Sequence, residues 1–321
     1  MIVTLTANPS IDHTVALSEP LRRGDLQRAR AATSYPGGKG VNVSRVVAGA
    51  GARTVAVLPG DPGDPLLRAL SETGLDYQAV PCGGPARTNI TLTEADGTTT
   101  KINEPGTPLT VDERIALADL LVELSRDASW VVLSGSLPPT VPVDWYVDLL
   151  RRLRRPGPGG IKVAVDTSDG PLLALAEHFD STAPHLIKPN AEELAQLTGG
   201  DPDELQDPGA AARAASVLVA RGVETVLATL GAAGAVLVTA SGAWHATAPA
   251  ITARSTVGAG DSALAGYLLA DLDHQAPPDR LRRAVAYGSA AAALPGTGLP
   301  GPHHTDPSAV HVTALDLQPH H

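Results

Sequence analysis

The sequence predicts an α/β protein with a three-layer α/β/α fold, in which helices cover both faces of a mostly parallel sheet. Short runs rich in Val, Ile and Leu alternate along the 321 residues with longer runs whose apolar residues recur at helical spacing. Only one Phe occurs among the 43% of apolar residues, so Ala, Val and Leu must form the core. Strand–helix alternation of this kind gives parallel strands joined by helical crossovers.

The elements follow one another in a regular order, in which most strands are followed by a helix. The predicted strands are 2–7, 53–60, 129–136, 161–168, 185–190, 223–231 and, near the C-terminus, 309–317. The predicted helices are 39–51, 63–74, 111–128, 143–155, 171–178, 191–200, 208–222, the one that follows the turn at 258–260, and 279–294. The stretches 154–160 and 199–209 are rich in Gly and Pro and are expected to be surface loops.

Two stretches break the alternation. Residues 12–35 carry β-like pieces without a helix, and residues 86–104 are typical of a hairpin that turns at Asp96-Gly97. We expect the two stretches to form a small antiparallel sheet, a lid, beside a single domain that spans 1–321. The exposed edges of such a lid suit pairing between subunits, so a homodimer through the lid is the expected assembly.

Composition excludes several classes of function. A net charge of −10 argues against nucleic acids and anionic membranes as partners. No apolar run reaches membrane length and the first residues lack a basic leader, so a cytoplasmic location is expected. Cys82 is the single cysteine, which excludes an intrachain disulfide and a cysteine-rich metal site. The histidines of the tail from Pro300 lack the spacing of a zinc site.

Lysine is scarce, because only four of the 24 Lys and Arg residues are lysine. A chain that favours Arg so strongly is expected to keep Lys where a compact ammonium group is needed. Lys39, Lys101 and Lys188 lie in the motifs discussed below. Lys162 lies at the edge of a predicted strand, and no role is expected for it.

Five polar or glycine-rich loops follow predicted strands or begin a helix. In an open parallel sheet, ligands bind at the carboxyl ends of the strands, so these loops are expected to form one site. They are "TANPSID" (6–12), "SGSLPP" (134–139), "KPNAEE" (188–193), "TLGAAG" (229–234) and "STVGAGD" (255–261).

The last of these loops places Asp261 between a glycine-rich turn and an apolar helix. Gly258 and Gly260 allow a ligand to approach the backbone closely, and the helix N-terminus that follows attracts anions. Asp261 is either a plain helix cap or a base beside a bound phosphate. A carboxylate next to a phosphate is useful when it takes the proton of an attacking hydroxyl. Phosphoryl transfer to an alcohol needs that base together with backbone donors.

Two common nucleotide-binding motifs do not account for this turn. The chain has no G-x-x-x-x-G-K-[ST], which excludes a P-loop. "GAGDSA" (258–263) fits the dinucleotide fingerprint, but it lies near the C-terminus, and its Asp would repel a pyrophosphate. A nicotinamide-dependent oxidoreductase is therefore an alternative that the position of the motif disfavours.

Two separate motifs carry a resemblance to a known family. "PGGKGVNVS" (36–44) and "STVGAGDSALAGYL" (255–268) resemble the signature regions of the ribokinase-like, PfkB-type sugar kinases, and the order of the loops between them agrees. The resemblance to the hexose-phosphate branch of that family is carried by "TANPSID" (6–12), "RTNITL" (87–92), "TKINEPG" (100–106), "SGSLPP" (134–139) and "PGTG" (295–298). It implies a ribokinase-like fold with a β lid, and ATP and Mg²⁺ as cofactors.

The resemblance also implies roles for individual residues. Asp261 would be the base, and the amides of Gly258, Ala259 and Gly260 would form the anion hole. The residues implied for substrate are Asp12, Gly37, Gly38, Lys39, Asn42, Arg87, Lys101, Asn103 and Ser136. The residues implied for the nucleotide are Lys188, Thr229, Gly231, Gly234 and Ser289, and those for the metal are Asn190 and Glu193.

The residue pattern supports some of these roles and offers structural alternatives for others. Strand alternation places Arg87 with Asn89, and Lys101 with Asn103, over the expected site, where the fork of Arg87 suits a phosphate. Lys101 and Asn103 are otherwise solvent-facing. Asn190 and Glu193 also fit a capping box, Asp12 fits an Asx turn, and 229–235 fits a tight hairpin.

The function implied is ATP- and Mg²⁺-dependent phosphorylation of a hexose phosphate. Fructose 1-phosphate is the expected acceptor, phosphorylated on its 6-hydroxyl to fructose 1,6-bisphosphate while the closed lid excludes water. A kinase for tagatose 6-phosphate or fructose 6-phosphate is the nearest alternative. A non-catalytic sugar-phosphate sensor is the alternative of another class, although a sensor does not need the base.

Overall fold

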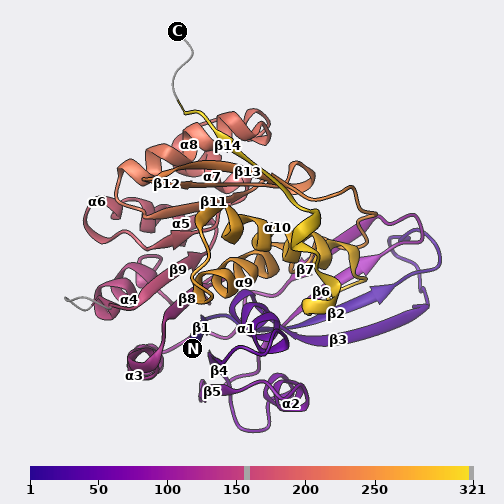
Figure 1. Ribbon diagram of the computed structural model, residues 1–321. Helices are drawn as coiled ribbons and strands as arrows, with labels where there is room; N and C mark the ends of the chain where they lie inside the picture. The colour runs from indigo at the N-terminus through magenta and orange to yellow at the C-terminus, as the bar shows by residue number, and fades with distance from the viewer. Residues whose placement is uncertain (155–159, 318–321) are drawn as a thin grey trace.

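Residues 1–154 and 160–317 are described by this computed structural model. Most of the predicted loop 154–160 and the last four residues of the histidine-rich tail lie outside the described residues. The central sheet of the three layers in Figure 1 follows the order β14-β13-β12-β11-β10-β9-β8-β1-β4-β5. Its strands are β1 (Ile2–Thr6), β4 (Thr54–Pro59), β5 (Tyr77–Val80), β8 (Trp130–Ser134), β9 (Lys162–Asp166), β10 (Leu186–Ile187), β11 (Thr225–Thr229), β12 (Ala235–Thr239), β13 (Gly242–Thr247) and β14 (His311–Leu315).

The sheet is parallel from β5 to β11 and antiparallel from β11 to β14. The prediction of a mostly parallel sheet is therefore confirmed, and the final strand predicted at 309–317 is present as β14. The strands β5 and β13 were not predicted, and β12 was anticipated only as the strand after the tight hairpin that was the alternative for 229–235.

Helices cover both faces of this sheet, as predicted. One face is covered by α1 (Lys39–Gly49), α2 (Pro65–Glu72), α9 (Ala259–Leu272) and α10 (Pro277–Ala293). The other face is covered by α3 (Val111–Leu124), α4 (Trp145–Leu153), α5 (Asp169–Ala176), α6 (Phe179–Thr182), α7 (Ala191–Thr198) and α8 (Pro208–Ala220). Among the described residues, no helix is both long enough and apolar enough to cross a membrane.

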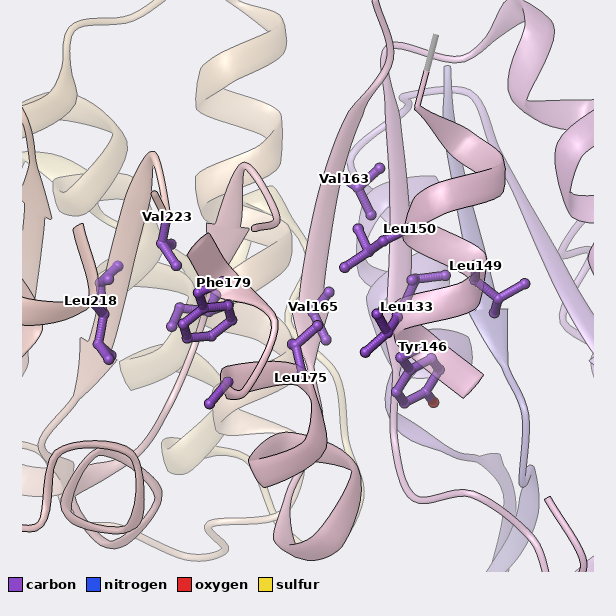
Figure 2. Packing of buried hydrophobic residues seen from close by; sticks show 14 of the residues in the cluster. Leu133, Tyr146, Leu149, Leu150, Val163, Val165, Leu175, Phe179, Leu218 and Val223 are labelled. Atoms are coloured by element: carbon purple, nitrogen blue, oxygen red, sulfur yellow. The ribbon is translucent and has the colours of Figure 1, made fainter. Parts of the chain in front are cut away.

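Aliphatic side chains fill the space between the sheet and the helices. Figure 2 shows Leu133, Val163 and Val165 of the central strands among buried residues of α4, α5, α6 and α8. Alternation along each strand sends neighbouring residues to opposite faces, so Val3 packs in this layer while Ile2 packs under α1 and α9. Each such side chain contributes roughly 1.5–3 kcal/mol on full burial. This rigid body fixes the strand ends where the polar loops begin.

The lid is a separate four-stranded sheet. Its order is β3-β2-β6-β7, formed by β2 (Ser10–Ala16), β3 (Ala31–Gly37), β6 (Arg87–Thr93) and β7 (Thr99–Asn103). The β2–β3 and β6–β7 hairpins are antiparallel, as predicted, but β2 and β6 pair in parallel. Both central strands run in the same direction, so their first residues, Ser10 and Arg87, are paired. The lid projects to one side of the body (Figure 1).

A buried ionic cluster joins α9 to the sheet and to α10. Asp271, near the end of α9, accepts hydrogen bonds from Trp130 Nε1 at 2.7 Å and Lys162 Nζ at 3.0 Å. Arg280 Nη1 of α10 lies 2.7 Å from its other oxygen. The prediction that Lys162 has no role was wrong, because Lys162 donates to Asp271. Nothing in the sequence indicated this pair, since the two residues lie 109 positions apart.

Candidate active site

The polar loops meet at the carboxyl ends of the parallel strands, where α1 and α9 also begin. Asn42 Nδ2 of α1 donates a hydrogen bond of 2.9 Å to Asp261 Oδ2 of α9, across 219 residues of sequence. Gly38 is the N-cap of α1 with φ of 106°, and a Cβ there would lie 2.6 Å from Thr6 Cγ2. The glycine lets the helix start against the end of β1, so the two signature motifs lie in direct contact.

Asp261 is a buried carboxylate rather than the residue that caps its helix. Gly258 is the N-cap, with φ of 74°, and Asp261 lies in the first turn with 7% of its surface exposed. Burial and the charge of Asp166 raise its pKa to about 6, while Lys39, the bond from Asn42 and Lys188 oppose the rise. A carboxylate with this pKa is ionised at neutral pH and still basic enough to accept a proton.

The turn that precedes Asp261 faces a lysine. A Cβ at Gly260 would lie 3.0 Å from Lys188 Nζ, so glycine makes room for the ammonium group beside the first turn of α9. The amide of Ala259 donates to Thr256 O at 3.3 Å, and so has an internal partner. The resulting first turn of α9 combines a helix N-terminus with a cation, which suits an anion.

Asp166, which the sequence analysis did not assign, lies at the centre of this arrangement. Its side chain is 0% exposed; Lys39 Nζ lies 2.7 Å from Oδ1 and Lys188 Nζ 3.4 Å from Oδ2. Burial opposes its ionisation, but the two lysines hold the pKa of Asp166 below its ordinary value. Burial likewise opposes the charge of Lys39, yet the surrounding carboxylates, chiefly Asp166, hold its pKa above the ordinary value. The only sequence signal for Asp166 was its place at the end of a central strand.

Asn190 and Glu193 form the capping box that was the structural alternative for them. Asn190 Oδ1 accepts from the Glu193 amide at 2.8 Å, and Glu193 Oε2 accepts from the Asn190 amide at 2.9 Å. Burial raises the pKa of Glu193, although Lys39 opposes this rise. Within the described residues, no group of three or more His, Cys, Asp or Glu side chains gathers as a metal site. The oxygen donors fit a magnesium ion that takes most of its ligands from phosphates and water.

Asp12 of the lid is held in place by its neighbours. Ser10 Oγ donates to Asp12 Oδ1 at 2.8 Å, and Asn89 Nδ2 donates to the same oxygen at 3.1 Å. A Cβ at Gly37 would lie 2.2 Å from Asp12 Oδ2, so any other residue at this position would displace the carboxylate. The sequence analysis assigned no role to Ser10.

The predicted cations of the lid differ in their surroundings. Arg87 is half-buried and donates from Nη1 to Glu104 O at 3.1 Å. Asn103 lies opposite Asn89, and Lys101 opposite Thr91, and both residues of β7 are exposed. Pairing of Asp12 with Asn89 places all these residues on the face of the lid that carries Asp12.

Asn8, which the sequence analysis missed, joins the lid to the body. Its Nδ2 lies 3.0 Å from Pro105 O, just after the lid, and 3.3 Å from Ser136 Oγ, in the loop after β8. A Cβ at Gly106, whose φ is 94°, would lie 2.1 Å from Asn8 Oδ1. The predicted substrate residue Ser136 is therefore connected to the base of the lid through one amide.

The predicted nucleotide loop is a tight turn between β11 and β12. Gly231 and Gly234 have φ of 56° and 90°, and a Cβ at Gly234 would lie 2.0 Å from Ala246 O. Thr229 forms a bridge with Asn190, which brings the loop beside the capping box. A Cβ at Gly288 of α10 would lie 3.3 Å from Ala259 O. Ser289, the next residue, therefore lies near the start of α9. The hairpin alternative is thus correct, and it leaves the loop at the edge of the site.

Comparisons with known proteins agree with this geometry. The sequence is 36% identical to a 1-phosphofructokinase of Xanthomonas campestris pv. campestris over 84% of each chain. It is 32% identical to that of Escherichia coli over 99% of this chain and 98% of the relative. The crystal structure of phosphofructokinase-2 from Escherichia coli in complex with fructose-6-phosphate has a TM-score of 0.81 and 29% identity, over 91% of this chain and 93% of that one.

The family assignment follows from the length of the match. Residues 5–304 match the family described as pfkB family carbohydrate kinase, which takes in both signature motifs and the lid. This match identifies the chain as a kinase, and a kinase uses ATP. The "GAGDSA" turn, which lies inside the matched region, therefore belongs to a phosphoryl-transfer enzyme, and the oxidoreductase alternative is excluded. The three-layer body with its β lid is accordingly a ribokinase-like fold, and the chain belongs to the pfkB family of carbohydrate kinases.

Proposed function

We propose that the protein transfers the γ-phosphoryl group of ATP to the 6-hydroxyl of fructose 1-phosphate and so makes fructose 1,6-bisphosphate. The observation that carries the proposal is Asp261, a buried carboxylate with its pKa raised to about 6 in the first turn of α9. Two ammonium groups, those of Lys39 and Lys188, act on the same carboxylate. A base beside a cationic anion site is what phosphoryl transfer to an alcohol requires.

In the proposed reaction, the oxygen of the sugar hydroxyl forms a bond to the γ-phosphorus as the bond from phosphorus to the leaving oxygen of ADP breaks. The proton of the hydroxyl passes to Asp261, which Asn42 orients through its 2.9 Å hydrogen bond. The amides of Gly258 and Gly260 would face the transferring group, with Lys39 and Lys188 nearby. The amide of Ala259 would join them by exchanging its 3.3 Å bond to Thr256 O for a phosphoryl oxygen. Fixed donors of this kind stabilise the charge that builds up during transfer.

The lid face that carries Asp12 is proposed to hold the sugar. Asp12 accepts hydrogen bonds from the sugar hydroxyls on its second oxygen, Oδ2, since Oδ1 already accepts from two donors. Arg87 binds the phosphate that the sugar already carries. Its Nε has no hydrogen-bond partner among the described residues, and the planar guanidinium suits two parallel hydrogen bonds to a phosphate. Lys101, Asn103 and Ser136 complete the contact when the lid closes and excludes water.

The nucleotide is proposed to lie along the turn after β11. Thr229 and Gly231 would contact its phosphates, Gly234 allows the turn, and Ser289 would line the adenine side. Asn190 and Glu193 would hold a magnesium ion and its waters, since both present oxygen donors next to that turn. When bound, the ion neutralises charge on the phosphates of ATP. The chain is proposed to act as one kinase domain.

The choice of acceptor rests on the named relatives, and a substrate panel tests it. ADP release is measured with fructose 1-phosphate, fructose 6-phosphate, tagatose 6-phosphate and free fructose in parallel. The highest kcat/KM on fructose 1-phosphate supports the proposal. A preference for another hexose phosphate keeps the kinase and corrects the acceptor. Binding of fructose 1-phosphate without turnover of any acceptor would favour the sensor.

A homodimer through the lid is proposed on the character of its second face. Opposite Asp12, this face carries Val15, Ile90 and Ile102, and Ile102 is 53% exposed. Ile102→Lys should convert a dimer to a monomer in light scattering at fixed protein concentration. Val217 of α8 is 51% exposed and serves as the matched control. A monomeric wild type, or a dimer that survives the substitution, contradicts this assembly.

A further inference from the structure

Asp166 is the most enclosed charged group of the site, and the roles proposed so far do not use it. Its side chain is 0% exposed at the end of β9, with no neighbour of opposite charge other than Lys39 and Lys188 among the described ion pairs. A buried ion costs several kcal/mol of desolvation, and well-packed apolar residues often replace such pairs without loss of stability. Stability alone therefore gives little reason for the group, and its position suggests a second role.

We propose that Asp166 is a positioning residue for phosphoryl transfer, whose carboxylate holds the ammonium groups of Lys39 and Lys188 together near the first turn of α9. The inference rests on the proposed function and deepens it. Asp166 itself is not expected to touch the reacting atoms. It acts through the two lysines, which would otherwise repel each other and separate.

The geometry ties each lysine to the reaction centre. Lys188 Nζ lies 3.0 Å from the position that a Cβ of Gly260 would take, so it borders the proposed anion site directly. Lys39 begins α1, the helix that also carries Asn42, the hydrogen-bond donor to Asp261. One carboxylate thus holds Lys39 of α1 together with Lys188, which follows β10 and borders the first turn of α9.

The hold on Lys188 is looser than the hold on Lys39. Asp166 Oδ2 has no hydrogen bond within the described residues and lies 3.4 Å from Lys188 Nζ, whereas Oδ1 receives Lys39 at 2.7 Å. An acceptor left unsatisfied in a buried site is costly. A loosely held ammonium group can move to a phosphate oxygen at small cost, and this freedom suits a residue that must meet an incoming anion.

The same charges act on the base, which supplies a readout that a purely structural role would not affect. The groups that face Asp261 are Asp166 of β9, Lys39 and Asn42 of α1, and Lys188 after β10. Asp166 favours the protonated form of Asp261, and the others favour the ionised form. Neutralising Asp166 should therefore move the acidic limb of the kcat/KM–pH profile to lower pH.

The test compares Asp166→Asn and Asp166→Glu in the full chain. Asp166→Asn should lower kcat about 100-fold, with a smaller change in the KM for ATP, and shift the acidic midpoint downward. Asp166→Glu keeps the charge but moves it by one methylene, so kcat should fall about tenfold with the midpoint unchanged. If Asp166→Asn fails to fold, Asp166→Glu alone decides. A wild-type kcat in the folded variants, or an Asp166→Asn midpoint equal to that of the wild type, overturns the proposal.

Asp271→Asn is the matched control, since Asp271 is also buried between two cations, at the far end of α9. It should leave kcat per folded molecule and the acidic midpoint unchanged. The affinity for a non-hydrolysable ATP analogue, measured by calorimetry, tests the positioning role of Asp166 separately from the proposed function, because the measurement needs no turnover. Weaker binding to Asp166→Asn supports the positioning role even if no acceptor is phosphorylated, and unchanged binding contradicts it. A wild type that turns over no sugar phosphate refutes the proposed function alone.

Discussion

Two buried aspartates, Asp166 and Asp271, each lie between two cations, but their hydrogen bonds differ. Asp271 receives Trp130 Nε1 and Lys162 Nζ, and Arg280 lies 2.7 Å from its other oxygen. Asp166 has one short contact, to Lys39, and an oxygen without a hydrogen bond among the described residues. Asp271 lies at the C-terminal end of α9, and Asp166 acts on Asp261 at the N-terminal end of the same helix.

The difference separates a cluster that holds the fold from one that, as proposed above, is completed by a ligand. The hydrogen bonds and ion pairs of Asp271 hold α9 against β8, β9 and α10. Both oxygens of this carboxylate are therefore paired within the protein itself. The cations around Asp166 face a helix N-terminus that is itself suited to an anion. Incomplete pairing of buried charge is typical of functional sites, where a substrate completes the set.

The largest expected effect comes from the third buried aspartate. Asp261→Asn should lower kcat by about 10³-fold or more, because the base is lost while the fold is kept. The same change should stabilise the protein at pH 7 by about 3 kcal/mol, since a pKa raised from 3.8 to about 6 means that folding disfavours the ionised form. Denaturant unfolding and steady-state kinetics measure the two effects, and a loss of both stability and activity would contradict this account.

Asp271→Asn should show the opposite combination. It leaves Lys162 and Arg280 without their shared partner, so the free energy of unfolding should fall by about 2–3 kcal/mol, less than for a fully buried pair because Lys162 is partly exposed. Urea unfolding at pH 7 measures the loss. Activity per folded molecule that falls more than twofold would mean that the two ends of α9 are coupled.

The pH dependence of the wild type gives a finer comparison. The ionised fraction of Asp261 should limit kcat/KM below about pH 6, with about a tenfold loss per pH unit and a plateau above. Stability linked to this carboxyl runs the other way: it is present below the ordinary pKa of 3.8 and is lost as the pH rises through about 6. Initial rates in overlapping buffers test the first statement. Asp271→Asn should keep the same midpoint, and a shifted one would show that Asp271 also senses the site.

The smallest expected effect concerns the glycine that faces Lys188. Gly260→Ala places a methyl group 3.0 Å from Lys188 Nζ, so the ammonium group must move, and kcat should fall by about three- to tenfold. Gly49 of α1 is exposed with open space around its Cβ position, and Gly49→Ala is the control. The control should gain about 0.5–1 kcal/mol of stability and keep its activity. Equal kinetics in the two variants would show that Lys188 is not needed at that position.

Periodicity in the sequence was enough to predict the body of the fold, because most strands and helices are long apolar runs. The strand β5, "YQAV", was missed since only its last residue is β-branched and a Gln interrupts the apolar run, and β13, "GAWHAT", lacks β-branched residues except at its end. In the site, glycines and motif residues carried the prediction. The sequence analysis missed Asp166, Asn8 and the ionic partner of Lys162. Their hydrogen-bond partners lie 97 to 128 positions away in the sequence, and no motif marks these pairs.

The parallel pairing of β2 with β6 has a consequence for how the chain folds. The two strands are joined by residues 17–86, which include α1, β4, α2 and β5 of the body. Closing a loop of this length is entropically unfavourable until the intervening segment has condensed. The lid is therefore expected to form after the body, and its amide hydrogens to exchange with solvent through openings that leave the body intact. Neither hairpin can be moved to another protein as a complete module, because half of each central strand's backbone partners belong to the other hairpin.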